Sequence, residues 1–460
     1  MRSLDSIAQE LEGYDPQALS AATVREFLSR LVVPVASHET VGIFQALGRV
    51  LSHDVISPIS VPPHDNSAMD GYAFDGAQLS AQAPLNLQVV GTALAGKAWT
   101  GVVAPGECLK IMTGAVLPRG LDTVVPQEFV TRPTDASRLA TGESSNTELI
   151  VIPAGLLHAG DNRRCLGEDL MQGRPALQKG EPLTPAALGL LASLGIEKIQ
   201  VWRKLRVAYF STGDEILSLG EPPREGAVYD SNRYTVWGLL TRLGCEVIDL
   251  GVVRDEPALL EAAFLSAAEQ ADAIITSGGV SVGDADYTKA MMKKLGDVAF
   301  WKIAMRPGRP MAVGRILKAK LASSPREISA GSYQINSDST SPEAAILFGL
   351  PGNPVAVMVT FLAFVRPALL QMMGSTADAP PLLKAHSLEP LRKKPGRTEY
   401  QRGTVSTAPD GSLQVKTTGS QGSGVLSSMV QANGLIVLHH HQGNVAPGDE
   451  VDVMMFDGVI

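Results

Sequence analysis

The sequence predicts an α/β protein of several domains: a central, mostly parallel β-sheet domain, a β-rich inserted domain, a helical linker domain and a C-terminal β-barrel. Two observations lead to this class. The chain has 460 residues, enough for about three domains that each bury their own core. Strand-like and helix-like patterns alternate through residues 201–375, whereas short β-type runs separated by Pro and Gly fill residues 58–162 and 376–460.

Helical patterns flank the first β-rich region on both sides. Apolar residues recur at helical spacing in two groups, which are Val24, Phe27, Leu28 and Leu31, and then Phe44, Leu47, Val50 and Leu51. Another helix is predicted over residues 183–194, where Thr184 caps the helix, Pro185 suits its first turn and Gly195 ends it. We expect residues 1–57 and 163–200 to form one discontinuous helical linker domain.

The remaining segments are predicted from strand-like runs. In residues 58–162 the runs are LNLQVV, ECLKIM, DTVVPQEFV and ELIVI. In residues 201–375 the strands LRVAYF, CEVIDLGVV, ADAIIT and AAILFGL are followed by helices over residues 232–243, 257–269, 287–295 and 355–372. In residues 376–460 the runs EYQRGTVST, SLQVKTT, GLIVLH and EVDVMMF predict a small barrel.

Composition excludes several classes of function. The net charge of −8 argues against DNA or RNA as a partner. Cys108, Cys165 and Cys245 are odd in number and widely spaced, which disfavours a disulfide framework and fits a reducing compartment. The N-terminal segment is acidic where an export signal needs an apolar core, and the longest apolar run, residues 355–365, is too short to cross a membrane. These features predict a soluble cytoplasmic protein without a membrane partner.

Four unusual loops each follow a predicted strand of the α/β domain. They are STGDE (211–215), RDE (254–256), TSGGVSVGDADYTK (276–289) and PGNP (351–354). Each loop alone is compatible with an ordinary turn. Because ligands collect at the carboxyl edge of parallel sheets, the four loops together indicate a binding site.

The residue types in these loops suit an anion and a divalent cation. Gly278 and Gly279 allow close backbone approach, and the amides after them can form an anion nest with Ser277 and Ser281. The loops also carry the carboxylates of Asp214, Glu215, Asp255, Asp284 and Asp286. Carboxylates are the ligands that Mg²⁺ prefers, although a solvated acidic rim would look the same. The loops contain neither a P-loop nor a dinucleotide-binding motif.

Three further segments are ambiguous on physical grounds. If FWKIAM (300–305) is a strand, Lys302 and Arg306 can point the same way and suit an oxyanion, or they can be surface charges of an edge strand. The turn-rich segment 62–74 carries Asp65 and Asp70, and Thr113 lies beside a glycine in KIMTGAVLP. The three histidines at 439–441 alternate in direction along a strand, which disfavours a three-His metal site.

Ten motifs together resemble the molybdopterin molybdenumtransferase family, the MoeA-like proteins that include the gephyrin E domain. The motifs are PPHDNSAMDGYA, IMTGAVLP, RCLGEDL, STGDEI, YDSNRY, TSGGVSVGDADYTK, WKIAMRPGRP, GLPGNPVAV, EYQRG and TGSQGS. They span nearly the whole chain in the order of the family. The resemblance implies a homodimer of four-domain subunits, with a MogA-like molybdopterin-binding sheet domain and dimer contacts from the linker domain.

The resemblance also implies an activity and its site residues. The expected reaction is the Mg²⁺-dependent insertion of molybdate into adenylylated molybdopterin, with release of AMP. The expected catalytic residues are Glu215, Asp255 and Asp286, which also hold Mg²⁺, together with Asp70 and Thr113, which face the partner subunit's site. The expected substrate-binding residues are Ser277, Gly278, Gly279, Ser281, Asp214, Pro351, Pro354 and Arg164. The expected molybdate-binding residues are Lys302, Arg306, Arg402 and Ser423.

The sequence departs from the family pattern at two places. Arg306 and Arg309 stand where relatives usually have Lys, which keeps the charge but changes its geometry. Leu166 replaces an arginine of the family, so that one cation beside Arg164 is missing. Two alternatives remain open: a molybdopterin adenylyltransferase, which shares the sheet domain, and a non-catalytic scaffold or carrier. The resemblance implies contacts with the adenylyltransferase and with apo-molybdoenzymes.

Overall fold

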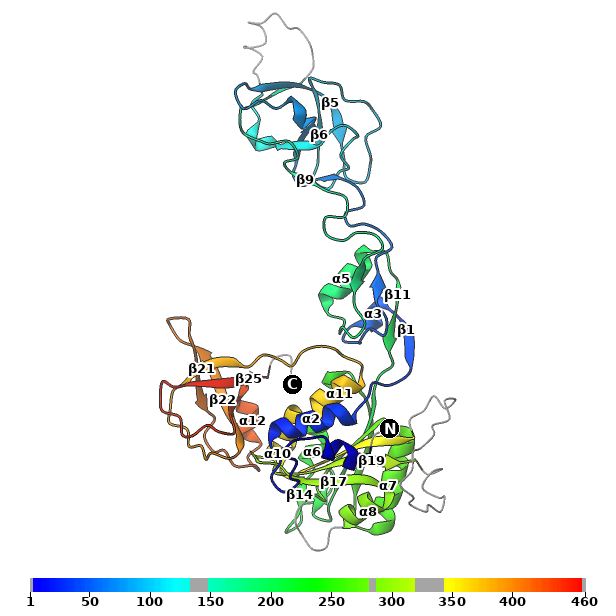
Figure 1. The fold of residues 1–460 in the computed structure, drawn as a ribbon, viewed down its shortest axis with the longest axis vertical. Coiled ribbons are helices and arrows are strands. Elements are labelled where there is room, and N and C mark those ends of the chain that lie inside the picture. Colours follow the sequence, from blue (N-terminus) through cyan, green and yellow to red (C-terminus); the bar gives the residue numbers. More distant parts are fainter. Residues whose placement is uncertain (1–2, 133–147, 281–286, 319–342, 457–460) are drawn as a thin grey trace, which may run out of the picture. The chain divides into compact units, whose positions relative to one another are not determined.

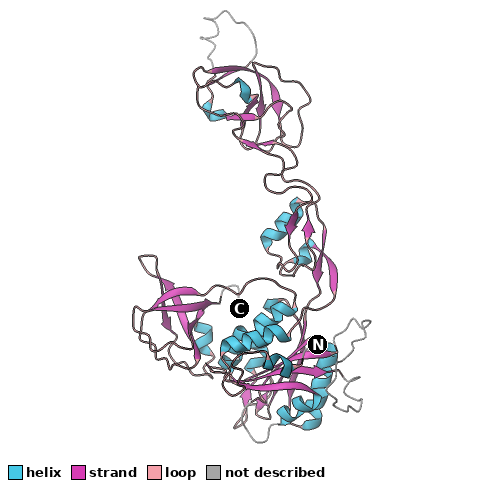
Figure 2. Cartoon of the chain, viewed as in Figure 1, coloured by secondary structure: helices cyan, strands magenta, loops and turns pink. Residues whose placement is uncertain are grey.

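The computed structural model describes residues 3–132, 148–280, 287–318 and 343–456. The chain forms two compact units, one made of residues 1–53, 179–188 and 198–460 and the other of residues 54–178 and 189–197. Helices and strands alternate in much of the first unit, whereas strands dominate the second (Figures 1 and 2). The predicted class, a mostly parallel sheet domain with additional β domains, is confirmed.

The central sheet of the first unit contains six strands within the described residues. In spatial order they are β15 (Glu246–Val253), β12 (Arg206–Thr212), β16 (Ala273–Ser277), β20 (Ala344–Leu350), β19 (Pro310–Leu317) and β17 (Gly296–Lys302). Strands β15, β12, β16 and β20 are parallel, and β19 is antiparallel to both of its neighbours. The carboxyl ends of all strands except β19 therefore lie at one edge.

Helices cover both faces of this sheet. They are α6 (Ser231–Leu243), α7 (Pro257–Gln270), α8 (Tyr287–Leu295), α10 (Pro354–Thr360), the π-helical η3 (Phe361–Val365) and α11 (Arg366–Met372), as predicted to within a few residues. Alternate residues of a strand point to opposite faces. Val207 and Tyr209 of β12 accordingly share a core with α6, α10 and α11, whereas Ala208 and Phe210 share one with α7 and α8.

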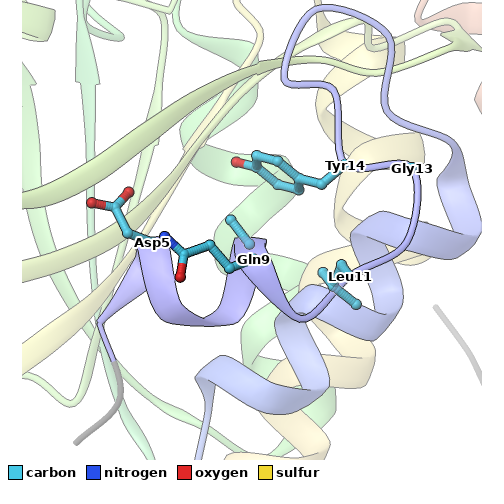
Figure 3. A pocket seen from close by; sticks show the side chains of 6 residues that line it. Asp5, Gln9, Leu11, Gly13 and Tyr14 are labelled. Atoms are coloured by element: carbon cyan, nitrogen blue, oxygen red, sulfur yellow. The ribbon is translucent and has the colours of Figure 1, made fainter.

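The N-terminal helices pack differently from the prediction. Helices α1 (Leu4–Gln9) and α2 (Ala21–Leu31) lie in the core of the sheet, where Phe27 meets Trp301 edge to face with ring centroids 4.9 Å apart. The predicted grouping of residues 1–57 with 163–200 is therefore wrong for these helices, because their apolar stripe is buried on the sheet. Near them, α1 and the turn after it line a pocket of about 450 Å³ beside Tyr14 (Figure 3).

The second predicted N-terminal helix shrinks to α3 (Ile43–Ala46), and Phe44 is fully exposed. Gly48 adopts a φ of +72°, which ends the helical path after one turn. Around it, β1 (His38–Gly42) pairs with β11 (Lys198–Trp202). Helix α5 (Pro185–Ser193) forms as predicted, with its Ala187 amide bonded to the Thr184 hydroxyl at 3.2 Å.

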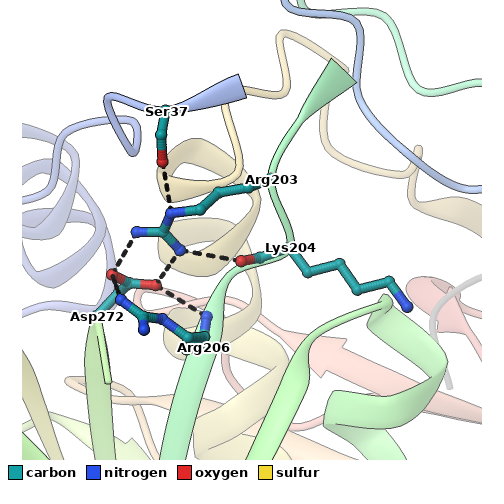
Figure 4. Close-up of polar contacts among 5 residues, drawn as sticks. All are labelled: Ser37, Arg203, Lys204, Arg206 and Asp272. Atoms are coloured by element: carbon teal, nitrogen blue, oxygen red, sulfur yellow. Dashed lines mark hydrogen bonds and ion pairs between the residues drawn. The ribbon is translucent and has the colours of Figure 1, made fainter. Parts of the chain in front are cut away.

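A buried ion pair fixes the amino edge of the sheet (Figure 4). The Asp272 carboxylate accepts two hydrogen bonds of 2.7 Å from Arg203 and one of 2.9 Å from the Arg206 amide. Arg203 also donates to the Ser37 hydroxyl at 2.6 Å. The starts of β12 and β16 are thereby joined, which leaves their opposite ends to carry loops.

The C-terminal segment forms a closed barrel of five strands in the region that the structure describes, which confirms the prediction. The strands are β21 (Leu383–Ser387), β22 (Thr398–Thr407), β23 (Leu413–Thr417), β24 (Gly434–Leu438) and β25 (Glu450–Met455), with α12 (Ser427–Gln431) between β23 and β24. Closure comes from the pairing of β22 with both β23 and β24. Tyr400 and Leu435 of the barrel share the core of α10 and α11, so the barrel packs on the sheet domain.

The segment FWKIAM forms a strand of the central sheet only as far as Lys302, so the condition under which Lys302 and Arg306 would point the same way is not met. Strand β17 ends at Lys302, and β18 (Met305–Arg306) instead pairs with the start of β22 in the barrel. The Ile303 amide bonds to the carbonyl of Arg309, so residues 303–309 leave the sheet as a loop. Lys302 and Arg306 therefore belong to different sheets.

The second unit is built from strands around two small cores. Its strands are β2 (Val55–Ile56), β3 (Asn66–Ser67), β4 (Gly71–Phe74), β5 (Leu85–Ala93), β6 (Glu107–Ile111), β7 (Thr123–Pro126), β8 (Leu149–Ile152), β9 (Arg163–Arg164) and β10 (Pro175–Leu177). Short 3-10 turns form η1 (Gly76–Gln78) and η2 (Gln127–Phe129), and the first unit also contains the pair β13 (Ile216–Leu217) and β14 (Val228–Tyr229). Strands β7, β4, β6, β5 and β8 form one sheet. The four strand-like runs predicted β5, β6, β7 and β8, whereas β4 lies in segment 62–74, which was expected to be rich in turns.

Residues 354–372 form one apolar helical segment, which matches the helix predicted over residues 355–372 and extends beyond the apolar run of residues 355–365. Among the described residues it is the one helix with the length and composition of a membrane span, with a mean hydropathy of 1.8. Its most apolar window is 78% buried inside the protein. Its apolar character is explained by this core position.

Candidate active site

Three loops meet at the carboxyl edge of the sheet. The last residues of β12 and β16 are neighbours, with Ser211 opposite Ser277, and Ser277 lies opposite Leu350 at the end of β20. The Gly278 amide donates to the Leu350 carbonyl at 3.2 Å. The sequences TGDE, SGG and PGNP, which were predicted to share one edge, are thus brought together.

The glycine loop has room for no side chain. Gly278 and Gly279 have φ values of +89° and +64°. A Cβ on Gly278 would lie 2.5 Å from the Thr212 carbonyl oxygen, and a Cβ on Gly279 would lie 2.6 Å from the Thr288 side chain. Both glycines are therefore required by backbone conformation and by space. The predicted residues Ser281, Asp284 and Asp286 lie outside the described residues.

Ser277 does not point freely into solvent. Its hydroxyl is buried and lies 2.7 Å from the Tyr209 phenol and 3.2 Å from the Ser211 hydroxyl. Tyr209 and Ser211 are themselves 2.9 Å apart. Burial, and to a smaller extent the charge of Asp230, raises the pKa of the Tyr209 phenol, which therefore stays protonated.

The PGNP loop is held by helix α6. Asn232 Nδ2 donates to the Gly352 carbonyl at 2.7 Å, and Asp230 caps the helix by accepting from the Arg233 amide at 3.0 Å. Pro351 follows β20 directly, and Pro354 occupies the first position of α10. The oxygen atoms Asp230 Oδ2, Asn232 Oδ1 and Thr212 Oγ1 are buried without a hydrogen-bond partner among the described residues. Such atoms at a sheet edge are typical of a site that needs a ligand or ordered water.

The carboxylates lie in two neighbouring loops. The Asp214 carboxylate accepts from the Asp255 amide at 3.3 Å, and the Asp255 carboxylate lies 3.5 Å from the buried Thr288 hydroxyl at the start of α8. Glu215 is exposed and folds back against Gly213. In the part of the chain that is described, no three His, Cys, Asp or Glu side chains form a metal-binding group. The carboxylates of Asp255 and Glu215 nevertheless suit Mg²⁺, which binds through one or two carboxylates while it keeps several waters.

The cationic residues gather where the barrel meets the sheet domain. Arg402 is fully buried, and its guanidinium donates to the Ser428 hydroxyl at 3.0 Å and to the carbonyls of Ser420, Gln421 and Gly422 at 2.9 to 3.3 Å. Burial, and then the nearby charge of Arg306, lowers the pKa of Arg402 to about 10. Arg402 has no ion pair with a carboxylate among the described residues. Its charge thus adds to that of Arg306.

The loop that Arg402 holds reaches the sheet domain. The Ser423 carbonyl accepts a hydrogen bond of 3.1 Å from the Val355 amide, in the first turn of α10 and next to the PGNP loop. Gly308, in the loop that carries Arg306, lies against Thr360 of the same helix. Lys302 ends β17, whose carboxyl end lies at the same edge of the sheet. Residues of the barrel and of the sheet domain therefore converge beside α10.

A second set of predicted residues forms a cluster within the second unit. The Asp70 carboxylate accepts from both the amide and the hydroxyl of Thr113 at 2.7 Å, which lowers its pKa. Arg164 forms an ion pair of 2.5 Å with Glu168, and the Leu166 amide donates to Asp65 at 2.7 Å. These contacts bring together the motifs PPHDNSAMDGYA, IMTGAVLP and RCLGEDL.

Three protein-family regions match successive parts of this chain. Residues 19–195 match the MoeA N-terminal region (domain I and II), residues 208–371 a probable molybdopterin binding domain, and residues 384–456 the MoeA C-terminal region (domain IV). The chain is 39% identical over 436 residues to a molybdopterin molybdenumtransferase of Haemophilus influenzae, a match that covers 95% of this chain and 98% of the relative. The chain belongs to the molybdopterin molybdenumtransferase family. The family resemblance and the enzyme class expected from the sequence are confirmed.

Other members of the molybdopterin molybdenumtransferase family agree. One from Nostoc sp. is 34% identical over 422 residues, covering 90% of this chain and 88% of that protein. The crystal structure of the molybdopterin biosynthesis moeA protein from Pyrococcus horikoshii OT3 superposes with a TM-score of 0.74 at 25% identity, over 95% of this chain and 100% of that chain. The chain is accordingly an enzyme of molybdenum cofactor biosynthesis, and its relatives support molybdenum insertion.

Sequence reasoning missed some residues of this molybdopterin molybdenumtransferase fold. Asp230 and Asn232 were quoted only as part of YDSNRY, although an Asp directly before a helix is a recognisable cap signal. Tyr209 was predicted as part of the buried strand LRVAYF and Ser211 as the first residue of the loop STGDE, and no local pattern links the two side chains. Both side chains contact Ser277, which lies at least 66 residues further along the sequence.

Proposed function

We propose that this chain inserts molybdate into adenylylated molybdopterin in a Mg²⁺-dependent reaction that releases AMP. One observation carries the proposal: the glycine loop packs beside the PGNP loop that leads into α10, and the barrel loop of residues 420–424, which Arg402 holds, is bonded to the first turn of the same helix. A nucleotide-bearing substrate and a second anion can therefore be bound side by side. The matches to the MoeA terminal regions favour this activity over adenylylation by the sheet domain alone.

Each part of the site has a proposed task. The amides after Gly278 and Gly279 bind the substrate's phosphates, with Ser281, Asp214, Pro351 and Pro354 around them. Glu215, Asp255 and Asp286 hold Mg²⁺, which when bound neutralises negative charge on the phosphoanhydride. Lys302, Arg306 and Ser423 bind molybdate, a tetrahedral dianion that suits cationic donors and a hydroxyl. Arg402 acts through the loop of Ser423, because its own donors are engaged by that loop and by Ser428.

Water adds across the phosphoanhydride, so that one phosphorus–oxygen bond breaks, AMP leaves and the molybdopterin keeps its own phosphate. In the insertion step the two thiols of the molybdopterin form two molybdenum–sulfur bonds and give their protons to one molybdate oxygen, which leaves as water. We propose that a homodimer carries out this reaction in the cytoplasm, with Asp70, Thr113 and Arg164 of one subunit facing the site of the other. The adenylyltransferase would supply the substrate, and apo-molybdoenzymes would receive the product.

A reconstituted assay tests the proposal. The purified chain receives adenylylated molybdopterin, Mg²⁺ and molybdate, and both AMP release and reconstitution of an apo-molybdoenzyme are followed. We expect both signals, and we expect both to be lost in Asp286→Ala and to require more molybdate in Lys302→Ala. Tight substrate binding without AMP release would instead show a carrier.

A further inference from the structure

Three buried hydroxyls form a closed triangle beneath the glycine loop. Tyr209 and Ser211 belong to β12, and Ser277 is the last residue of β16. The oxygen atoms are separated by 2.7 Å for Tyr209 and Ser277, 2.9 Å for Tyr209 and Ser211, and 3.2 Å for Ser211 and Ser277. The arrangement requires two strands, because Ser277 follows Ser211 by 66 residues and Tyr209 by 68 residues in the sequence.

The triangle is chemically complete without water. Each hydroxyl has one proton to donate and lone pairs to accept. A cyclic arrangement, in which each donates to the next, satisfies all three groups in a part of the core where at most 3% of each residue is exposed. The raised pKa of the Tyr209 phenol keeps its proton in place at any physiological pH.

The position of the triangle connects it to the loop. Ser277 directly precedes Gly278, whose amide donates to the Leu350 carbonyl. Gly278 also packs closely against the carbonyl of Thr212, the residue that follows Ser211. A change in the direction of the Ser277 backbone would therefore turn the amides that follow it. The backbone of Gly278 and Gly279 would follow this change easily, because glycine has the largest conformational freedom of all residues.

We propose that Tyr209 and Ser211 are positioning residues that act through Ser277 to orient the amides of Gly279 and Val280 toward the phosphate of the AMP group. The inference rests on the proposed function and deepens it. It also gives the Ser277 hydroxyl a supporting task under the loop in place of direct substrate contact.

The test measures AMP binding by calorimetry in the full-length protein and in three variants. Tyr209→Phe, Ser211→Ala and Ser277→Ala each remove one hydroxyl and keep the apolar packing around it. Loss of one such hydrogen bond should raise the Kd for AMP about three- to tenfold. The double variant Tyr209→Phe with Ser277→Ala should bind no more weakly than Ser277→Ala alone, because Tyr209 acts through Ser277.

A matched control separates positioning from general stability. Tyr14→Phe removes another phenol of the same core, which accepts a 3.0 Å hydrogen bond from Trp301. It should lower Tm comparably and leave the Kd for AMP unchanged. Equal AMP binding by wild type, Tyr209→Phe and Ser277→Ala would overturn the inference, as would independent effects in the double variant. A wild-type protein that does not bind AMP would overturn the proposed function, and this inference with it.

Discussion

Arg402 illustrates how a single residue can serve a site without facing its ligand. The guanidinium is fully buried and satisfies the carbonyls of three successive residues, 420 to 422, which places Ser423 against helix α10. Five donors in a planar fork make this possible, and lysine has no such fork. The residue that matches a family position for molybdate is here an organiser of the loop.

Replacing Arg402 by Lys should therefore weaken both stability and anion binding. We expect the free energy of unfolding to fall by roughly 2–4 kcal/mol, because buried carbonyls lose their donors. We also expect the molybdate concentration required for half-maximal activity to rise. Urea unfolding and a molybdate titration measure the two effects, and Arg392→Lys on the same barrel is a control that should change neither. Wild-type behaviour of Arg402→Lys would contradict the assignment.

Asp70 is held in its ionised form by Thr113. The hydrogen bonds from the Thr113 amide and hydroxyl lower the pKa of Asp70 below its ordinary value of 3.8. Thr113→Val removes only the hydroxyl bond, so the pKa of Asp70 should rise part of the way back. The lowered pKa of Asp70 stabilises the folded state at pH values above the pKa of Asp70 in the unfolded chain. Wild type should therefore lose this stabilisation as the pH falls through the pKa of Asp70 in the folded protein.

Carboxyl NMR titration of wild type and Thr113→Val provides the comparison. The difference in stability between the two proteins should be present at pH 7 and should disappear as the pH falls through the lowered pKa of Asp70 in the folded wild type. An identical Asp70 titration curve in both proteins would show that the hydroxyl bond does not form in solution.

At the scale of elements, the glycine loop depends on the two segments that enclose it. Gly279 has a φ of +64°, and a Cβ at this position would clash with the side chain of Thr288 in α8. Gly411 of the barrel has a φ of +87°, but a Cβ there would meet no other atom. Gly411→Ala should cost only backbone strain of about 1–2 kcal/mol. Gly279→Ala should cost more than this in unfolding experiments and should abolish AMP binding. Equal costs and intact binding would contradict the close packing of the loop.

The sequence predicts well those elements whose signals are local. The helices of residues 231–270 and the four parallel strands β12, β15, β16 and β20 follow from the alternating pattern, and Thr184 and Gly195 mark the ends of α5 correctly. Strand β19 was not predicted. The loop at 303–309 could not be predicted, because β18 is stabilised by pairing with β22, about 90 residues away in the barrel. Phe44 and Leu47 have helical spacing, yet Gly48 ends the turn and leaves Phe44 exposed.

The same distinction applies to the candidate site. Gly278 and Gly279 could be identified from residue type alone, since their positive φ values reflect a property of glycine. The contact between Ser423 and Val355, and the triangle of Tyr209, Ser211 and Ser277, depend on tertiary packing that no local pattern encodes.

At the scale of the whole molecule, the proposal divides the work between subunits. Asp70 lies in the second unit and Asp255 in the first. If each active site combines one of each from different subunits, then Asp70→Ala and Asp255→Ala proteins, each inactive alone, should regain part of the activity when they are mixed and allowed to exchange subunits. Size-exclusion chromatography tests whether each protein forms the proposed dimer. Mixtures that stay inactive despite exchange would show that both residues act within one subunit.

The central claim is that the glycine loop of the sheet, Arg306 and the barrel loop of residues 420–424 form one composite site beside α10. The position of molybdenum in crystals grown with AMP and molybdate, located by anomalous scattering, tests this claim most directly. We predict molybdate next to Arg306 and the 420–424 loop, with the AMP phosphate at Gly278 and Gly279. Molybdate bound far from the barrel loop, or AMP bound away from the glycines, would contradict the account.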